Sequence, residues 1–483
     1  MNVRYGSPAG WWVLVAAVLG SAIAFLDSTV VTTALDSIAR DLNTDLAALQ
    51  WVLTAYLLTL GSLLVIGGAL GDRLGRRRVY VFGLGAFAAS SLLCGVAPNA
   101  GLLIGARCVQ GLTAALLVPG SLAIVSATFH PDDRGRAIGA WAGLAGVASA
   151  GGPFLGGWLI DSLSWRWVFL INLPIAAVAI VIALRHVPET RDEEASGSID
   201  VAGAVTLGLG LAGIVYALIE GPDGGWGGAP IAALLVGAVL LVVFLRIERA
   251  AADPMLPLEL FRSPQFAGAN AVTLFVYAAL GGATFLLVVH VQASLGYSAL
   301  EAGASLFPIT VLMVVFSARV GALAQSIGPR LPMTVGPIIG GAGLVLLVRV
   351  NPGVTYWSGV FPGVLLLAIG LTITVAPLTS AVLAAVSDRH AGVASAVNNA
   401  VARLAALLAV AVIPAAAGIA GAGASLDFGE GFDRAMVMLG GLCAVGGLVA
   451  AVTISRGTPV HAVTQAAPTQ ACHDPCVRVR EAA

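Results

Sequence analysis

The sequence contains no lysine, so its 24 Lys and Arg positions are all arginine. A Walker A loop needs a lysine that reaches the nucleotide phosphates, and a Schiff-base cofactor needs a lysine amine. Neither site can exist in this chain, which excludes an ATP-driven pump that carries its own ATPase. The net charge of -1 also argues against a nucleic-acid partner.

Charged residues are scarce as well, at 10% of 483 positions, where a soluble domain has about 25%. Hydrophobic residues make up 58%, which excludes a disordered chain. One bilayer crossing needs about 20 apolar residues, so the chain has room for about fourteen spans. We therefore expect an all-α, polytopic membrane protein whose surrounding partner is the lipid bilayer.

Apolar runs between polar residues give fourteen candidate spans. They cover roughly 11–34, 48–70, 79–97, 101–124, 136–160, 166–184, 200–219, 230–247, 267–290, 300–323, 332–349, 356–378, 391–421 and 434–455. The first run could also be read as a signal peptide, but it continues to Leu35 and is longer than a signal core.

The arginines predict the orientation. With both termini in the cytoplasm, 18 arginines fall on the inside, 4 on the outside and 2, Arg107 and Arg403, within spans. Loops rich in arginine stay on the cytoplasmic side. We expect a multi-pass protein of the plasma (inner) membrane with cytoplasmic termini.

An internal repeat is visible at offsets of 253 residues for a glycine-rich loop and 255 residues for an Asp-Arg pair. Gly68-Ala69-Leu70, Gly75 and Arg77 recur as Gly321-Ala322-Leu323, Gly328 and Arg330, and Asp133-Arg134 recurs as Asp388-Arg389. The repeats are eight spans apart, so they have the same orientation, and parallel repeats are typical of carriers with a site between the halves. We expect six-helix bundles at 1–190 and 263–456, two inserted helices in 191–262, and a flexible tail at 457–483.

The five cysteines suggest no disulfide framework, since three lie in apolar segments and two in the tail. Cys472 and Cys476 could bind a metal, but no second ligand cluster completes a site. We expect no metal and no cofactor.

The loop between spans 2 and 3 combines glycines with an acidic residue and several arginines. An acidic residue there can accept bonds from helix-end amides or pair with an arginine. We interpret the loop as a conformational latch, since a simple positive anchor would explain neither the acid nor the glycine spacing. The latch residues are Gly68, Asp72, Arg73, Gly75, Arg76 and Arg77.

The fifth span carries small residues at a spacing of four around a proline. Such a face allows close helix packing, and the proline removes one backbone hydrogen bond. Ordinary packing in a glycine-rich chain is an equally good explanation of the stretch alone. The residues are Gly152, Pro153, Gly156 and Gly157.

Asp27 and Arg107 are opposite charges inside apolar spans. Both are expected about 10 Å below the outer face, where an ionised residue costs about 2.5–3.5 kcal/mol. We interpret Asp27 as a protonation site whose charge state Arg107 helps to set. A static ion pair is the alternative.

Arg403 lies near the middle of the thirteenth span, with no obvious acidic partner. It could contact a polar or anionic substrate beside Asn398 and Asn399, or bind backbone carbonyls. Two arginines against one aspartate within the spans disfavour a dicationic substrate. Further candidate substrate contacts are Gln110, Tyr56 and Trp51, although buried aromatics more often serve packing.

These stretches together resemble the major facilitator superfamily, in its 14-span drug:proton antiporter branch. The segments that carry the resemblance are residues 26–31, 68–78, 107–111, 152–157 and 165–172. Two features depart from the branch: Thr32 to Asp36 replace its usual continuation, and acids that some relatives place in spans 10 and 13 are absent.

The resemblance implies a proton-coupled efflux transporter, not an enzyme, that exports amphipathic small molecules by alternating access. Protons would be the coupling ion, and neither nucleotide nor nucleic acid would be a partner. An exporter of one metabolite or self-made antibiotic is the first alternative. A membrane sensor or scaffold that does not transport is the second.

Overall fold

The computed structural model describes residues 3–191, 200–251, 254, 256–386, 391–419 and 428–455. Within these ranges the regular structure is helical, and fourteen helices are long and apolar enough to cross a membrane. The expected all-α fold of fourteen spans is confirmed. The predicted tail at 457–483, with Cys472 and Cys476, and the repeated Asp388-Arg389 pair lie outside the described residues.

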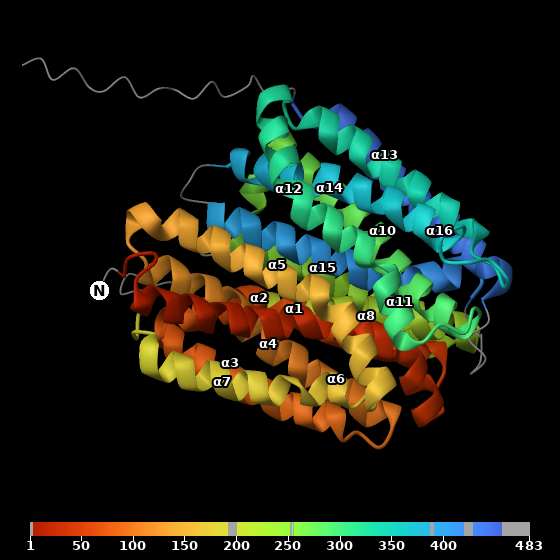
Figure 1. Ribbon diagram of the computed structural model, residues 1–483, viewed down its shortest axis with the longest axis horizontal. Helices are drawn as coiled ribbons and strands as arrows, with labels where there is room; N and C mark the ends of the chain where they lie inside the picture. Colours follow the sequence, from red (N-terminus) through yellow and green to blue (C-terminus); the bar gives the residue numbers. More distant parts are fainter. Residues whose placement is uncertain are drawn as a thin grey trace, which may run out of the picture.

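The helices form two bundles and an inserted pair (Figure 1). The first bundle comprises α1 (Pro8–Leu42), α2 (Leu46–Leu74), α3 (Arg76–Gly95), α4 (Ala100–Thr128), α5 (Pro131–Ser162), α6 (Trp167–Leu170) and α7 (Asn172–His186). The inserted pair is α8 (Val201–Gly224) and α9 (Gly228–Ala250), followed by the 3-10 helix η1 (Leu258–Arg262). The second bundle comprises α10 (Pro264–Ala293), α11 (Ala299–Ser305), α12 (Phe307–Ile327), α13 (Arg330–Leu346), η2 (Leu347–Arg349), α14 (Val360–Ala384), α15 (Ala391–Ala416) and α16 (Gly429–Thr453).

The spanning helices run between two faces of the molecule. We call the face that carries residues 4–7 and the turn at residue 75 the N-terminal face. The opposite face, with residues 43–45, 96–99 and 294–298, is the distal face. Side-chain caps fix several helix starts there: Asp45 accepts a bond from the Ala48 amide (3.0 Å), and Asn99 from the Leu102 amide (2.9 Å).

Two predicted spans are interrupted near the distal face. The sequence predicts unbroken helices over 166–184 and 300–323, but the structure breaks them at Ile171 and Leu306. Pro174 and Pro308 lie in the first turn of α7 and α12. Proline has no amide hydrogen, so neither residue can make the bond to residue i−4 that would continue the preceding helix.

The duplicated loops adopt similar backbone geometry. Gly75 between α2 and α3 has φ of 107°, and Gly328 between α12 and α13 has φ of 84°. Residues other than glycine rarely adopt a backbone conformation with such a positive φ. Equivalent turns at equivalent positions agree with an origin by duplication.

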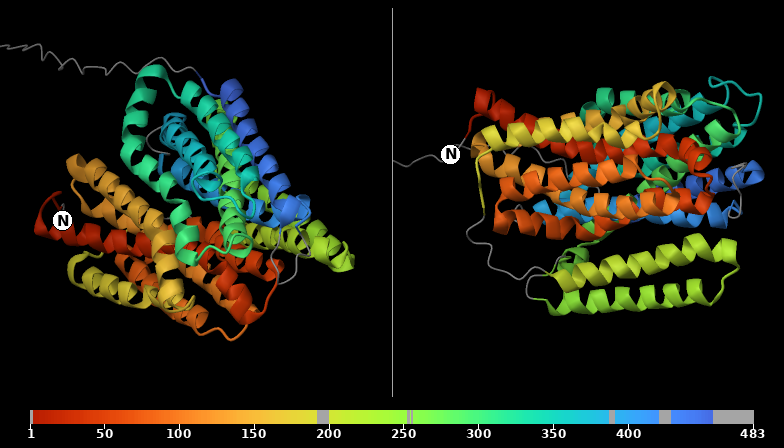
Figure 2. Two further views of the ribbon diagram at one scale, coloured as in Figure 1. Left: turned by 45° about the vertical axis from the view of Figure 1, so that its right-hand side comes forward. Right: turned by 90° about the horizontal axis from the view of Figure 1, so that it is seen from below.

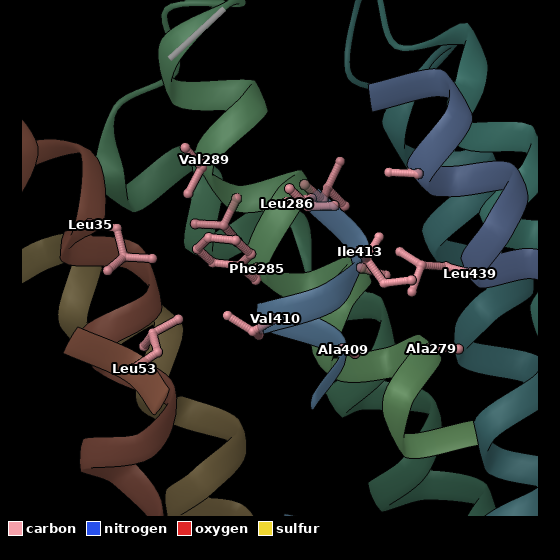
Figure 3. Packing of buried hydrophobic residues seen from close by; sticks show 14 of the residues in the cluster. Leu35, Leu53, Ala279, Phe285, Leu286, Val289, Ala409, Val410, Ile413 and Leu439 are labelled. Carbon is pink, nitrogen blue, oxygen red and sulfur yellow. The ribbon is translucent and has the colours of Figure 1, made fainter. Parts of the chain in front are cut away.

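The bundles meet in their distal halves and diverge toward the N-terminal face (Figure 2). One buried apolar cluster joins them: Leu35 and Leu53 of the first bundle lie opposite Phe285 and Val410 of the second (Figure 3). Toward the N-terminal face, the first bundle has a separate cluster formed by its own residues among those described. The shared core therefore holds the halves together at one end only.

The inserted helix α8 contacts both bundles. Leu211 and Val215 of α8 share a small apolar cluster with Leu58 of α2 and Leu407 of α15. The inserted pair therefore lies on one side of the molecule, alongside the junction between the two bundles (Figure 2).

Candidate functional site

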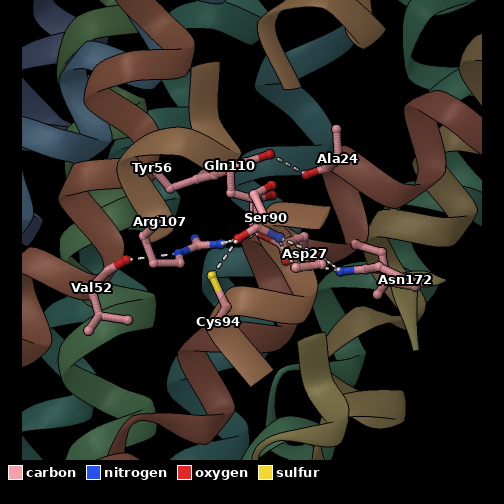
Figure 4. Close-up of polar contacts among 12 residues, drawn as sticks. Ala24, Asp27, Val52, Tyr56, Ser90, Cys94, Arg107, Gln110 and Asn172 are labelled. Carbon is pink, nitrogen blue, oxygen red and sulfur yellow. Dashed lines mark hydrogen bonds and ion pairs between the residues drawn. The ribbon is translucent and has the colours of Figure 1, made fainter. Parts of the chain in front are cut away.

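The centre of the first bundle contains a buried ion pair. The Arg107 guanidinium on α4 donates to the Asp27 carboxylate on α1, with 1% and 0% of the two side chains exposed (Figure 4). Because α1 continues to Leu42, Asp27 lies about 22 Å from the distal end of its helix. The predicted span ended at residue 34, so α1 is about two turns longer than expected, while Arg107 lies about 10 Å from the distal start of α4.

Two amides complete the coordination of the Asp27 carboxylate. Gln110 Nε2 donates to Oδ1 over 2.9 Å, and Asn172 Nδ2 donates to the same oxygen over 3.2 Å. Both amides also donate to Ser91 Oγ, at 2.7 and 3.1 Å. The carboxylate thus has three donors from α4 and α7, and α3 supports the amides.

Helix α2 contributes two further contacts of Arg107. Its Nε donates to the Val52 carbonyl over 3.0 Å, and its Cζ lies 4.2 Å from the centre of the Tyr56 ring. The Tyr56 hydroxyl donates to the Ala24 carbonyl on α1 over 2.9 Å. Asp27 is therefore held by the helices of one bundle alone, as far as the described residues show.

The residues predicted to contact substrate lie in three parts of the structure. Gln110 and Tyr56 are buried in the Asp27 cluster. Trp51 lies nearer the distal face, where its indole Nε1 donates to Glu220 of α8 over 3.0 Å. Among the described residues, no hydrogen bond links these three side chains to Asn398 or Asn399.

The other predicted contacts lie on α15. Asn398 turns toward α10 and donates to Asn270 (3.2 Å) and Thr273 (2.6 Å). Asn399 is exposed, and its amide donates to the carbonyl of Ser395 in the preceding turn. Arg403 reaches across to the first bundle, where its Cζ lies 5.5 Å from the centre of the Phe25 ring.

The side chains and amides of the latch loop contact residues of the first bundle. Asp72 accepts from Arg76, with 2.8 Å to Nε and 2.7 Å to Nη2. Glu189, which the sequence analysis did not single out, accepts from the Arg77 amide at 3.1 Å and lies 2.7 Å from where a Cβ of Gly75 would be. Arg73 is partly buried.

In this part of α2 the glycine that packs most closely against another helix is Gly67, one residue before the predicted Gly68. A Cβ on Gly67 would overlap the Ala115 carbonyl of α4, whereas a Cβ on Gly68 would lie an ordinary 3.5 Å from Pro119. Gly71 has open space around it. The loop pattern alone does not distinguish these glycines, because the packing partner lies on a distant helix.

The small residues of α5 face both bundles. Gly152 and Gly156 lie against Thr29 and Val30 of α1. Gly157 lies against α11 of the other bundle, where a Cβ would be 2.6 Å from the Ala299 carbonyl and would overlap the Leu300 backbone. A Cβ on Gly303 of α11 would overlap the Pro153 carbonyl oxygen. This stretch of α5 therefore packs closely against the second bundle on the distal side of the junction.

Asp161, one turn further along α5, was missed by the sequence analysis. Its carboxylate accepts bonds from the Ala299 amide (3.1 Å) and the Leu300 amide (2.9 Å) at the start of α11. Asp161 therefore links the two bundles at the distal face. No local motif marks it, because its partner is a helix end some 140 residues away in the sequence.

The Major Facilitator Superfamily profile matches residues 17–410. The chain belongs to the major facilitator superfamily. It is a multi-pass membrane transporter of small molecules and not an enzyme. Within the described residues no group of three His, Cys, Asp or Glu side chains could hold a metal ion.

Major facilitator proteins of bacteria are among its relatives. The chain is 36% identical to the methylenomycin A resistance protein of Bacillus subtilis, over 84% of this chain and 87% of the relative. It is 33% identical to the protein of the same name from Streptomyces coelicolor, over 94% of both chains. It is also 33% identical to the tetracenomycin C resistance and export protein of Streptomyces glaucescens, over 83% of this chain and 75% of the relative.

Solved major facilitator structures share the fold. A POT family transporter matches with a TM-score of 0.67 at 13% identity, over 92% of this chain and 96% of that one. A bacterial homologue of the human lysosomal transporter Spinster matches with a TM-score of 0.63 at 17% identity, over 93% and 98%. Both likenesses concern the fold alone.

Proposed function

We propose that the chain exports amphipathic small molecules, antibiotics among them, in exchange for protons. Relatives named for antibiotic resistance and export cover more than four fifths of the chain at 33–36% identity. The single observation that supports proton coupling is the buried contact between Asp27 and Arg107, on the helix that also faces the second bundle.

The N-terminal face is the cytoplasmic one in this proposal. The excess of arginine in the loops on that face supports the assignment, with the plasma membrane as the location. The described conformation is then closed toward the outside and splayed toward the cytoplasm. Substrate would enter between the bundles from the cytoplasm, where α15 presents Asn399 and Arg403.

Protonation of Asp27 changes the energy of the first bundle. An uncharged Asp27 leaves Arg107 as a buried cation without its anion, which costs about 3–5 kcal/mol when nothing else moves. Rearrangement of α1 against α4 relieves that cost. Since α1 also contacts α5 and the second bundle, such a rearrangement is transmitted to the junction.

The coupling needs a difference between the two states of the carrier. A ligand shifts an equilibrium only by its differential affinity for the two states. A proton taken up from outside would favour one state and lower the affinity for substrate there, so that substrate is released outward. Contacts of the latch loop with Glu189 would steady the first bundle as a rigid unit during this motion.

Inside-out vesicles with an acid interior and a fluorescent pH reporter test the proposal. Addition of a panel of amphipathic drugs should dissipate the gradient with wild type but not with Asp27→Asn. Asp36→Asn is the matched control, because Asp36 is a buried carboxylate on the same helix that pairs with Arg40 one turn away. Active transport by Asp27→Asn would contradict the proposal.

A narrow-substrate exporter is the second candidate. It is favoured by the names of the three relatives above, each of which refers to one antibiotic. The same vesicles distinguish the two, since a narrow exporter would respond to one chemical class within the panel and a multidrug exporter to several.

A further inference from the structure

Arg403 is a membrane-embedded cation at the junction of the two bundles. It lies 12 residues into α15 (Ala391–Ala416), about 18 Å from the cytoplasmic end of that helix and about 20 Å from the other. At that depth its side chain cannot reach the phosphate groups of the lipid surface. A cation at this depth is stabilised by the protein, by water that enters between the bundles or by a bound molecule.

Within the part of the chain that the structure describes, no acid balances this charge. Among the described residues no carboxylate oxygen lies within 4.0 Å of the Arg403 guanidinium, whereas Arg107 has Asp27 in direct contact. The Arg403 side chain is only partly buried. The structure thus contains two intramembrane arginines of opposite character, one paired within a bundle and one unpaired between bundles.

The contact with Phe25 leaves the donors of Arg403 available. The guanidinium carbon lies 5.5 Å from the ring centre, so the interaction with Phe25 uses the face of the guanidinium or one end of it. The guanidinium has five N–H donors along its edge, and these match the two oxygens of a carboxylate. An anion could therefore bind at the edge while an apolar body lies against the aromatic ring.

A polar stripe on α15 leads to this position. Ser395, Asn399 and Arg403 follow one another at a spacing of four, which places them on one face of the helix. Asn399 is exposed, and Ser395 is partly buried. The stripe begins near the cytoplasmic end of α15, where the bundles diverge (Figure 2).

Helix α1 connects this position to the proton site. Phe25 and Asp27 are two residues apart and so lie about 200° apart around the helix, on nearly opposite faces. Phe25 faces Arg403, and Asp27 faces Arg107. Movement of α1 that accompanies protonation would therefore alter the surroundings of Arg403 directly.

We propose that the transported substrate is an amphipathic monoanion, an apolar ring system bearing one carboxylate, and that Arg403 binds this carboxylate. The inference rests on the proposed function, because it names the substrate class of that transporter. It also predicts the electrical character of transport. Exchange of one inward proton for one outward monoanion moves two positive charges inward, whereas a cationic substrate would make the same exchange electroneutral.

Three probes with one fluorophore test the charge preference. Dansylglycine is a monoanion, dansylamide is neutral and dansylcadaverine is a cation. Binding to the purified protein is measured in detergent without a gradient, so a failure of proton coupling leaves this measurement unaffected. Wild type should bind dansylglycine at least tenfold more tightly than either other probe.

Variants at position 403 locate the interaction. Arg403→Gln should lose at least tenfold in affinity for dansylglycine while its affinity for dansylamide stays the same. Arg403→Glu should prefer dansylcadaverine, a gain that misfolding cannot produce. Arg319→Gln is the matched control, because Arg319 also lies beside a phenylalanine, 5.7 Å from the Phe316 ring, but on the exposed side of α12.

Several results would overturn the assignment. These are equal affinity of wild type for the three probes, a preference for the amine, no binding of the acid, or an equal loss of all three probes in Arg403→Gln. If the anion preference holds but Asp27→Asn still transports actively, the substrate class stands and proton coupling fails.

Discussion

The Asp161 carboxylate of α5 accepts a hydrogen bond of 2.9 Å from the Leu300 amide of α11. A carboxylate is favourable at a helix start, because the first amides of a helix are unpaired and the helix dipole is positive there. Here the acid belongs to one bundle and the helix to the other. The bond exists only while the distal face is closed, so it stabilises one state of the transporter.

We expect Asp161→Ala to shift the protein toward the state that is open at the distal face. Loss of the charge-assisted bonds should remove about 1.5–3 kcal/mol from the closed state. The measurement is alkylation of a cysteine at Ala302, which is fully buried in α11, by a membrane-impermeant maleimide in a background without other reactive thiols. Labelling should rise at least fivefold.

Glu301→Gln is the control for this variant. Glu301 caps the same helix from within its own bundle, through the capping box with Ser298. It should weaken α11 without opening the junction, so labelling should stay near that of the parent. Equal labelling in both variants would show that Asp161 acts only as a local cap.

We expect Gly157→Ala to prevent full closure of the distal face. The added methyl group would overlap the Leu300 backbone, which cannot move aside as a side-chain end could. Overpacking of this kind costs about 1–3 kcal/mol. Gly151→Ala is the matched control, because nothing lies within 4 Å of a Cβ at that position. The same alkylation assay measures both, and equal labelling would contradict the packing argument.

We expect the stability of the Asp27 and Arg107 variants to be non-additive. Arg107→Gln leaves a buried carboxylate without its cation and should cost about 3–5 kcal/mol. The double variant Asp27→Asn with Arg107→Gln should recover part of this loss, since residues in contact couple by about 0.5–3 kcal/mol. Thermal unfolding in detergent measures all four proteins, and simple addition of the two losses would rule out the coupling.

We expect two alanine substitutions in the latch loop to change the stability of the protein in opposite directions. Gly75→Ala places a side chain at φ of 107°, which should destabilise the protein by about 1–3 kcal/mol. Gly71→Ala lies inside α2 with open space around it, and should stabilise by about 0.5–1 kcal/mol. Thermal unfolding provides the comparison, and a stabilised Gly75→Ala would contradict the backbone argument.

Composition and periodicity were sufficient for the helical fold, because a bilayer imposes one length and one polarity on every span. Asp27, Arg107 and Arg403 could be singled out for the same reason, since charge is rare inside spans. Ser91 and Glu189 could not, because polar uncharged residues and loop acids are common, and Asn172 was marked only as the end of the 165–172 segment. Asp161 was missed, and Gly157 was singled out without its partner, because contacts between bundles leave no local sequence pattern.

The distal closure combines the shared apolar core with main-chain contacts at two glycines, Gly157 against Leu300 and Gly303 against Pro153. A side chain can swing through several rotamers and open a gap by degrees, but packed backbones separate only when whole helices move. The contacts at these two glycines are therefore either fully formed or fully separated. For an exporter driven by protons, as proposed above, this property would avoid a half-open form through which protons leak.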